Sequence, residues 1–395
     1  MKLPSLIFGK GWEELEKFNM LDLNERSIVF YSEDISSFAH FDQIIRELTE
    51  EMEYQICYVT SAEDDPILNT QNKKIKAFYI GDSIARTKFF LNLKAKILIM
   101  TMPDLETFNI KKSKVYPVHY VYLFHSMVST HLVYRRSAFD HFDSIFCVGN
   151  YQLDEIRSTE KLYNLKPKNL IRYGYGHLDN LLEKYSTRIL SPKNNGNKLH
   201  VLLAPSWSNA RLFEDIAEKV IDILLQEGYK VTFRPHLVTQ KKSKKKINEI
   251  IEKFSDNESF LLEQNILNFD SFLFSDIMIT DWSGAALEFA FAFEKPVLFI
   301  DIPKKINNPE YEKTQNVPIE VSIREKIGKI ILPTELELIP NEIEILYKQT
   351  KELRDKITKI RNELIFNIGE SEKYGAKEII KLLNEEKKNI LNDCT

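Results

Sequence analysis

Several features that mark particular classes of protein are missing from this sequence of 395 residues. Its three cysteines, Cys57, Cys147 and Cys394, are far apart and odd in number, so neither a paired-cysteine zinc motif nor a disulfide framework is indicated. No apolar run approaches the roughly 18 to 20 residues that cross a bilayer, and the N-terminus lacks the pattern of a secretory signal peptide. We therefore expect a cytoplasmic protein in a reducing compartment.

An excess of charge of one sign is also missing. The chain has 54 Lys and Arg against 58 Asp and Glu, a formal net charge of -4. A nucleic-acid-binding protein needs a strongly basic surface, so no nucleic acid is expected as a partner. The one short basic run, residues 241–246 (Lys-Lys-Ser-Lys-Lys-Lys), fits a solvated loop, and the alternative is attraction to anionic lipid or a polyanionic acceptor.

Common catalytic motifs are absent as well. The sequence contains no His-Glu-x-x-His, no Walker phosphate loop and no Gly-x-Ser-x-Gly elbow, which disfavours metalloprotease, P-loop and α/β-hydrolase chemistry. We expect no metal site and no cofactor.

What the chain does have is a recurrence of short β-branched and aromatic runs between helix-like stretches, which is typical of parallel sheets with crossover helices. The pattern predicts two Rossmann-like sheets. The predicted strands are residues 27–31, 55–59, 77–80, 97–101, 119–124 and 144–148, and then 199–204, 230–233, 276–280 and 296–301.

The length fits two domains. The junction is expected between residues 166 and 197, with residues 191–197 (Ser-Pro-Lys-Asn-Asn-Gly-Asn) as its loop. We predict a first Rossmann-like domain at 1–170, a second at 171–370 and an outer helix at 371–395; helical periodicity recurs in 343–366 and 376–391.

The strongest local feature is the segment 276–290, a buried strand followed by a tight turn and a helix rich in small residues. Backbone amides and the positive helix end at Ser283 and Gly284 suit a diphosphate. A structural cap by Asp281 or Ser283 explains the segment equally well. Glu288, in the same helix, either binds ribose hydroxyls or is an exposed residue without a role.

Two other predicted strands end in polar side chains. Arg234-Pro-His236 ends one strand, where ligands of open α/β sheets bind, and the guanidinium and imidazole suit phosphate oxygens. Ser206 follows another strand and is expected to line the same opening. A structural histidine at a strand end is the alternative for His236.

In the first half, a strand ends at His125. A cleft histidine titrates near neutral pH and can take a proton from an attacking hydroxyl, and His131 is a competing candidate. The other five histidines, His40, His119, His141, His177 and His200, are treated as structural.

In order, these segments resemble the CDP-glycerol glycerophosphotransferase family of teichoic-acid and capsule enzymes. His125 stands where that family has Trp-His-Gly, and Arg234-Pro-His236 resembles its Arg-Pro-His. The other matches are residues 174–179 with Gly-x-Pro-Arg-x-Asp, residues 204–207 with Ala-Pro-Thr-Trp and residues 280–284 with Thr-Asp-Tyr-Ser-Ser. The similarity spans roughly residues 122–301.

The resemblance implies a GT-B-like α/β fold, in which two Rossmann-like domains face each other across a cleft. It implies that His125 and His236 are catalytic, with His125 as the base. Arg234, Ser283 and Gly284 would hold the diphosphate of CDP-glycerol or a related CDP-polyol, and Glu288 the ribose. Ser206 and Asp281 are also expected to bind the diphosphate or nucleotide. The products are CMP and a glycerophosphorylated glycan or lipid-linked acceptor, which implies peripheral contact with the inner face of the membrane through residues 241–246 or 3–18.

This chain departs from the family pattern at several places. Phe124 and Ser126 replace the Trp and Gly around the base, and Gly284 replaces the second Ser; Gly176 and His177 replace the Pro-Arg pair. The donor polyol and the acceptor therefore stay open.

Two other functions remain as alternatives. The first is an inverting GT-B glycosyltransferase that uses a nucleotide sugar in capsule or lipopolysaccharide synthesis. The second is a non-catalytic subunit that binds a nucleotide or glycan.

Overall fold

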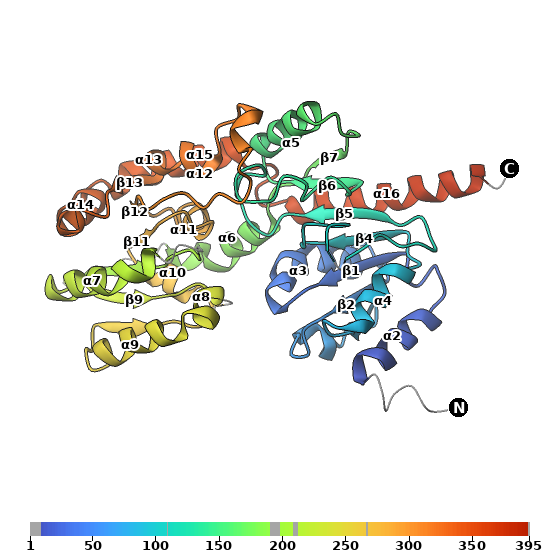
Figure 1. Ribbon diagram of the computed structural model, residues 1–395, viewed down its shortest axis with the longest axis horizontal. Coiled ribbons are helices and arrows are strands. Elements are labelled where there is room, and N and C mark those ends of the chain that lie inside the picture. The colour runs from blue at the N-terminus through green and yellow to red at the C-terminus, as the bar shows by residue number, and fades with distance from the viewer. Residues whose placement is uncertain (1–8, 109, 190–197, 208–211, 266–267, 394–395) are drawn as a thin grey trace.

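The chain folds into two α/β halves, each built on its own parallel sheet (Figure 1). The structure is a computed structural model, and it describes residues 9–108, 110–189, 198–207, 212–265 and 268–393. The expected junction loop at 191–197 lies outside these residues.

The first sheet has seven parallel strands in the order β3-β2-β1-β4-β5-β6-β7. Its strands are β1 (Ile28–Ser32), β2 (Ile56–Thr60), β3 (Ile75–Tyr79), β4 (Ile97–Met100), β5 (His119–Leu123), β6 (Ser144–Cys147) and β7 (Asn169–Arg172). The helices of this half are α2 (Lys10–Met20), α3 (Phe38–Arg46), α4 (Ile84–Asn92), α5 (Asn150–Leu162) and α6 (Gly176–Ile189), with short turns η1 (Ile35–Ser37), η2 (Glu47–Glu51) and η3 (Pro66–Asn69).

The second sheet has six parallel strands in the order β10-β9-β8-β11-β12-β13, which repeats the topology of the first. Its strands are β8 (His200–Leu203), β9 (Lys230–Phe233), β10 (Phe260–Leu262), β11 (Ile277–Thr280), β12 (Val297–Ile300) and β13 (Gly328–Ile331). The helices are α7 (Leu212–Gln226), α8 (Leu237–Lys242), α9 (Lys244–Phe254), α10 (Asp270–Phe274), α11 (Ala285–Phe293), α12 (Ile319–Ser322), α13 (Arg324–Ile327), α14 (Ile339–Lys348) and α15 (Thr350–Leu364), with turns η4 (Tyr311–Thr314) and η5 (Leu336–Leu338). This strand order is that of a Rossmann fold, so the predicted two-sheet α/β architecture is confirmed.

The central strands are buried on both faces, as parallel sheets covered by helices require. In β1, Ile28 and Phe30 face one hydrophobic cluster while Val29 and Tyr31 face another. Helices contribute one apolar stripe each: in α7 the buried residues follow helical spacing, at Ala217, Val220, Ile221 and Leu224.

One hydrophobic cluster runs through both halves. It joins side chains of the first half, such as Tyr122 in β5 and Val128 in the loop that follows β5, to side chains of α11, such as Leu287 and Phe293. The two halves are therefore packed against each other directly.

The last helix, α16 (Ser371–Asp393), returns to the first half (Figure 1). Its buried residues Ala376, Ile379 and Leu382 belong to the cluster beneath the first sheet. Asp179 fixes the start of α16 by accepting hydrogen bonds from the amides of Gly369 (2.8 Å) and Ser371 (3.0 Å).

The turn that contains Gly174 packs against the segment that precedes α16, and only glycine fits at this position. Gly174 has a φ of +101°, and a Cβ there would lie 2.3 Å from the carbonyl oxygen of Phe366. Side chains are therefore excluded where the chain passes back over the glycine-bearing turn.

No helix in the described parts of the chain is both long enough and apolar enough to span a membrane.

Candidate functional site

The carboxyl ends of the two sheets meet where β5 and β11 end. His125 and Ser126 follow β5, and Ser283 and Gly284 lie between β11 and α11. A Cβ placed on Gly284 would lie only 2.4 Å from Ser126 Oγ. The loop that carries His125 is therefore in direct contact with the N-terminus of α11.

His125 is held in one orientation by the first half. Its Nδ1 lies 3.1 Å from the carbonyl oxygen of Thr101, and because a carbonyl only accepts, Nδ1 carries the proton and Nε2 keeps a free lone pair. Burial lowers the pKa of His125, although the bond to Thr101 and the charge of Asp34 oppose the shift. The imidazole is thus neutral near pH 7, the state of a general base.

Tyr175 joins His125 to the second half. Its buried hydroxyl lies 2.8 Å from Glu288 Oε1 on α11 and 3.0 Å from the carbonyl oxygen of His125. The glycine-bearing turn of residues 174–176 therefore does more than connect the halves, since it fixes α11 relative to the His125 loop.

The N-terminus of α11 offers free backbone donors. Ser283 Oγ accepts a hydrogen bond from the amide of Ala285 at 3.3 Å. Among the described residues, the amides of Ser283 and Gly284 have no hydrogen-bond partner. Unpaired amides at the positive end of a helix are suited to bind an anion.

Asp281 and Ser206 bind each other. Asp281 is almost fully buried, and its two oxygens accept from the backbone amide of Ser206 at 2.8 Å and from Ser206 Oγ at 3.0 Å. Burial raises the pKa of Asp281, and the bonds from Ser206 oppose that shift. This pair links the turn after β8 to the turn after β11.

His236 caps the N-terminus of α8. Its Nδ1 accepts a hydrogen bond from the amide of Val238 at 3.1 Å, so the neutral ring presents an Nε2–H donor. Burial, followed by the charge of Lys305, lowers the pKa of His236.

Arg234 is engaged with its own half. It forms an ion pair with Glu263 at 2.7 Å and lies over the rings of Phe269 and Phe272. Arg234 thereby fixes the end of β9, next to His236.

Lys305 is a cation at this edge that sequence patterns did not indicate. Its Nζ lies 4.7 Å from the ring centre of Trp207, and Lys242 Nζ lies 4.6 Å from the same ring. Burial lowers the pKa of Lys305, against the attraction of Asp281, and no carboxylate of the described residues forms an ion pair with it. Its position in a loop after β12, without a recognisable motif, explains why it was missed.

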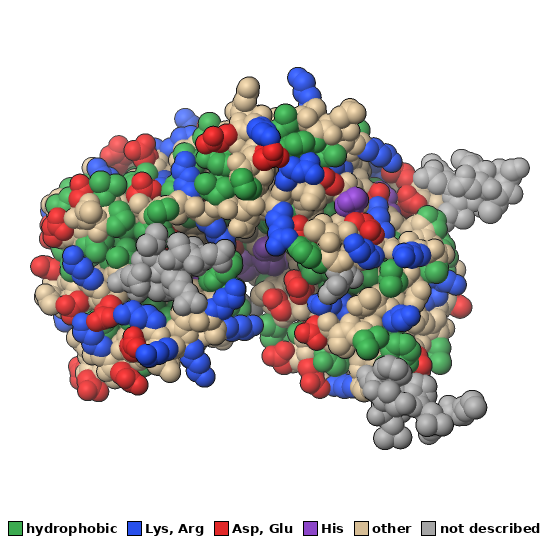
Figure 2. All heavy atoms as spheres, viewed as in Figure 1, with side chains coloured by type: hydrophobic (Ala, Val, Ile, Leu, Met, Phe, Trp, Pro, Cys, Tyr) green, Lys and Arg blue, Asp and Glu red, His purple; other side chains and the backbone are tan. Residues whose placement is uncertain are grey.

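A hollow separates the outer parts of the two halves, and histidine side chains lie at its base (Figure 2). Lys and Arg side chains line its second-half side, whereas Asp and Glu line its first-half side (Figure 2). Basic residues of the segments that follow the second sheet's strands include Lys242, at the end of α8, and Lys305, and acidic residues that follow the first sheet's strands include Asp34 and Asp82. The second half is therefore the better side for an anionic ligand.

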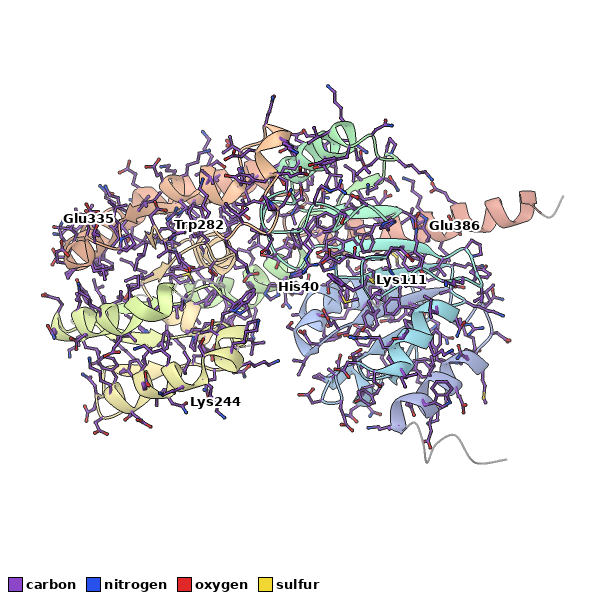
Figure 3. The ribbon with its side chains drawn as sticks, viewed as in Figure 1. His40, Lys111, Lys244, Trp282, Glu335 and Glu386 are labelled. Carbon is purple, nitrogen blue, oxygen red and sulfur yellow. The ribbon has the colours of Figure 1, made fainter. Side chains whose placement is uncertain are left out.

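The histidines at the base form a cluster. The ring centre of His40 lies 6.1 Å from that of His125 and 5.2 Å from that of His177, and His40 lies between the two halves (Figure 3). The interpretation of His40 and His177 as purely structural overlooked this contact, because their segments are distant in sequence.

His131, the competing candidate for the base, is only 3% exposed. It lies 3.4 Å from Glu155 and 3.2 Å from the carbonyl oxygen of Asn316. This burial and these contacts favour a structural role for His131 over the competing assignment as the base.

A small cavity lies beside the N-terminus of α11, lined by Ser283, Gly284, Glu320 and Arg324 among others. Arg324 stacks on Trp282, with its guanidinium carbon 4.0 Å from the ring centre. Its Nη1 pairs with Asp301 at 2.7 Å, whereas its Nε and Nη2 have no partner among the described residues, although Arg324 is only 4% exposed. The buried Glu320 lines the same cavity, so carboxyl groups lie close to this guanidinium.

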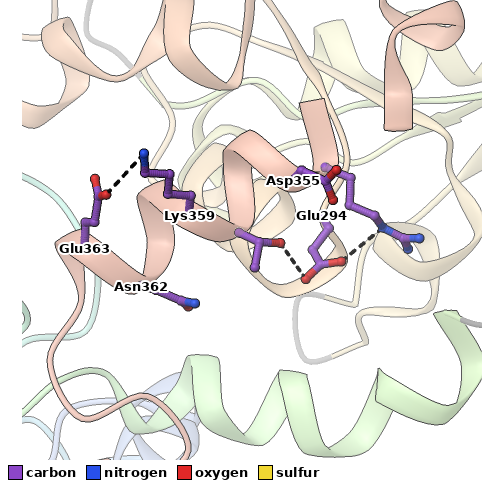
Figure 4. A pocket seen from close by; sticks show the side chains of 7 residues that line it. Glu294, Asp355, Lys359, Asn362 and Glu363 are labelled. Carbon is purple, nitrogen blue, oxygen red and sulfur yellow. Dashed lines mark hydrogen bonds and ion pairs between the residues drawn. The ribbon is translucent and has the colours of Figure 1, made fainter. Parts of the chain in front are cut away.

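A more open surface pocket lies elsewhere, between α15 and the end of α11 (Figure 4). Glu294 at its centre pairs with Arg354 at 3.0 Å and accepts from Thr358 at 2.9 Å. Its charges are compensated internally, and it contains none of the residues discussed above.

In the described parts of the chain, no group of three or more His, Cys, Asp or Glu side chains is arranged to hold a metal ion.

Two Rossmann-like halves that meet at the carboxyl ends of their sheets define a GT-B-like α/β architecture. Residues 15–368 match the family model of CDP-glycerol:poly(glycerophosphate) glycerophosphotransferases. The chain belongs to this family, and the resemblance found in its sequence motifs is confirmed. The family match identifies the chain as a glycerophosphotransferase and favours neither the glycosyltransferase nor the non-catalytic alternative.

Solved structures agree on the fold. A structure of the wall teichoic acid polymerase TagF with CDPG is 15% identical, with 96% of this chain and 95% of that chain covered and a TM-score of 0.60. A UDP-GlcNAc 2-epimerase from Methanocaldococcus jannaschii, in complex with UDP-GlcNAc and UDP, is 14% identical, with 91% and 99% covered and a TM-score of 0.54. The comparison with curated proteins gave no match.

Proposed function

We propose that this enzyme transfers glycerol phosphate, or a related polyol phosphate, from a CDP-linked donor to a hydroxyl of a cell-surface glycan or lipid-linked acceptor, with release of CMP. The observation that carries the proposal is the contact of the His125 loop with the N-terminus of α11, where Ser283 and Gly284 have free amides. A base and an anion site are thereby adjacent although they come from different sheets.

In this proposal the donor binds to the second half. The amides of Ser283 and Gly284 and the Nε2–H of His236 donate to the diphosphate oxygens, and Lys305 adds a positive charge. Arg234, Asp281 and Ser206 hold the turns that carry these groups, through the bonds described above. The basic side of the hollow supports this placement (Figure 2).

The ribose of the donor would reach Glu288. Its Oε1 accepts from Tyr175, and its second oxygen is then left for a sugar hydroxyl. Tyr175 fixes the direction of this carboxylate, so ribose binding and the orientation of the His125 loop depend on the same hydroxyl.

His125 acts as the general base. The acceptor hydroxyl gives its proton to His125 Nε2 while its oxygen attacks the β-phosphorus of the donor. A bond from that oxygen to phosphorus forms, the bond from phosphorus to the CMP oxygen breaks, and CMP leaves with the electron pair. Such a reaction needs mainly positioning and stabilisation of charge on the phosphoryl oxygens, which the α11 N-terminus, His236 and Lys305 supply.

The decisive experiment identifies the released nucleotide. Purified protein is incubated with an acceptor mixture and with CDP-glycerol, CDP-ribitol and nucleotide sugars in parallel. We expect CMP from a CDP-polyol. Release of only a nucleoside diphosphate from a nucleotide sugar would instead identify sugar transfer and contradict the proposal.

We also propose contact with the inner face of the membrane, where a lipid-linked acceptor is anchored. Lys244 lies on the second half (Figure 3), and Lys241, Lys242, Lys244 and Lys245 are exposed. Lys246 is instead paired with Glu218 at 2.9 Å. The four exposed lysines suit weak attraction to anionic lipid.

A further inference from the structure

Gly284 occupies a position whose backbone does not require glycine. Its φ of -61° and ψ of -28° are ordinary right-handed helical values, which every L-residue adopts. The obstacle to a side chain is the first half of the molecule, because a Cβ on Gly284 would lie 2.4 Å from Ser126 Oγ and 3.2 Å from Val128 Cγ1. Glycine is therefore explained by the hydroxyl that fills the space.

Ser126 Oγ consequently lies where a side-chain atom of residue 284 would be. It is a hydroxyl delivered by the first half to the first turn of a helix of the second half. Ser126 is half-buried, and its hydroxyl makes no hydrogen bond with another described residue. It is thus available to a ligand at the free amides of Ser283 and Gly284.

Ser126 and Gly284 are about 160 residues apart in sequence and meet in space. Together they place one hydroxyl and one gap at the helix N-terminus.

A second feature of this helix end is Arg324, which lines the cavity beside Ser283 and Gly284 and is 4% exposed. Its Nη1 pairs with Asp301 at 2.7 Å, whereas Nε and Nη2 have no partner among the described residues. Buried donors without partners are rare in folded proteins, and a phosphate oxygen bound at this helix end is one group that these two donors would suit.

We propose that Ser126 is a donor-binding residue, which gives its hydroxyl hydrogen to a diphosphate oxygen of the CDP-polyol at the N-terminus of α11, and that residues 126 and 284 form one coupled pair. This inference rests on the proposed function. The hydroxyl lies next to His125 in sequence, so a single loop of the first half carries both the base and a group that holds the phosphate under attack.

A double-mutant cycle tests the pair. In Ser126→Gly the hydroxyl is lost and the fold is unaffected, so CDP-glycerol should bind roughly 10- to 100-fold more weakly by calorimetry, as expected for one hydrogen bond to a charged group. In Gly284→Ser the new side chain collides with Ser126, so both donor binding and thermal stability should fall. The double variant S126G/G284S restores a hydroxyl and a gap, and it should recover both.

The double variant S126A/G284A is the matched control. The Cβ of Ser126 lies 3.7 Å from the position that a Cβ of residue 284 would take, an ordinary contact, so the fold should be as stable as in S126G/G284S. Donor binding should stay weak, because no hydroxyl is present. This control separates packing from hydrogen bonding.

The possible results distinguish failure of the Ser126 role, of its coupling to residue 284 and of the proposed function. Wild-type affinity for CDP-glycerol in Ser126→Gly, together with CMP release by the wild type, would overturn the role of Ser126 and leave the proposed function intact. A double variant S126G/G284S no better than Gly284→Ser would overturn the coupling. A wild-type protein that binds no CDP-polyol and releases no CMP would overturn both this inference and the proposed function.

Discussion

Replacing His125 by asparagine separates its chemical role from its structural one. The asparagine amide nitrogen can take the place of Nδ1 and keep the hydrogen bond to the carbonyl oxygen of Thr101, which is 3.1 Å long in the wild type. The lone pair of Nε2 has no equivalent in asparagine. The substitution therefore removes the proposed base with little change in the loop that carries it.

The expected loss follows from the size of general base catalysis, which contributes about 100- to 10,000-fold. This corresponds to about 2.7 to 5.4 kcal/mol of transition-state free energy at 1.36 kcal/mol for each factor of ten. The kcat for CMP release from CDP-glycerol should fall within this range in His125→Asn. Donor affinity, measured by calorimetry, and the thermal unfolding midpoint should stay close to those of the wild type.

The dependence of activity on pH tests whether His125 acts in its neutral form. The base works only when it is neutral, so activity is lost as the pH falls through the pKa of His125. Burial lowers this pKa, which places the acidic limb of kcat/KM below the ordinary histidine value of about 6.5. In His125→Asn this limb should be absent.

His40→Asn is the matched control, since His40 lies in the same cluster, 6.1 Å from His125 between ring centres. It has no bond to Thr101 and is not placed at the reacting atoms, so its kcat should change less than that of His125→Asn. If His125→Asn kept more than about a tenth of the wild-type kcat, or if both variants lost activity equally, His125 could not be the base.

Three further changes test the surroundings of the site. Tyr175→Phe removes a buried hydroxyl that contacts both Glu288 and His125, so the free energy of unfolding in chemical denaturation should fall by about 1 to 3 kcal/mol. The control Tyr163→Phe loses a partly exposed hydrogen bond to Glu310 and should lower the free energy of unfolding less. Equal losses in the two variants would contradict the bridging role of Tyr175. Lys305→Met keeps an apolar side chain over Trp207 but removes the positive charge. The KM for the donor should rise roughly 10- to 100-fold, and thermal stability should not change. An unchanged KM would show that Lys305 is not part of the donor site. The double variant K244E/K245E should co-sediment less with anionic vesicles, whereas CMP release in an assay with a water-soluble acceptor should not change. Undiminished sedimentation would show that another surface contacts the membrane.

The sequence predicted the central strands of both sheets and missed three strands at the sheet edges. The ten predicted strands are all present, and their ends differ from the observed ones by at most two residues. The three that were missed, β7, β10 and β13, each lie at the edge of a sheet. Edge strands bury few side chains, so their residues carry little of the apolar signal from which strands are predicted; β7 has a single buried residue.

The site was predicted where motifs were local and missed where it depends on distant contacts. His125, His236 and Ser283 each follow a buried strand, and parallel strands bring such positions to one edge. No local pattern indicated that Tyr175 joins Glu288 to the His125 loop, or that Ser126 faces Gly284. These contacts arise between segments at least 50 residues apart, and they form only when the chain is folded.

The way in which the halves are joined indicates how the site works. Interfaces between mobile domains are usually small and polar, whereas here one hydrophobic cluster continues from the first sheet into α11. Buried hydrogen bonds fix the same boundary: the amide of Ser129 donates to Glu320 at 2.8 Å, and Asn308 Nδ2 donates to the carbonyl oxygen of His131 at 3.0 Å. The His125 loop and the α11 N-terminus are thus held in place before a donor arrives. Phosphoryl transfer depends on donors that are already aimed at the developing charge. In the mechanism proposed above, the packing of the interface therefore supplies the alignment of the base with the donor-binding amides.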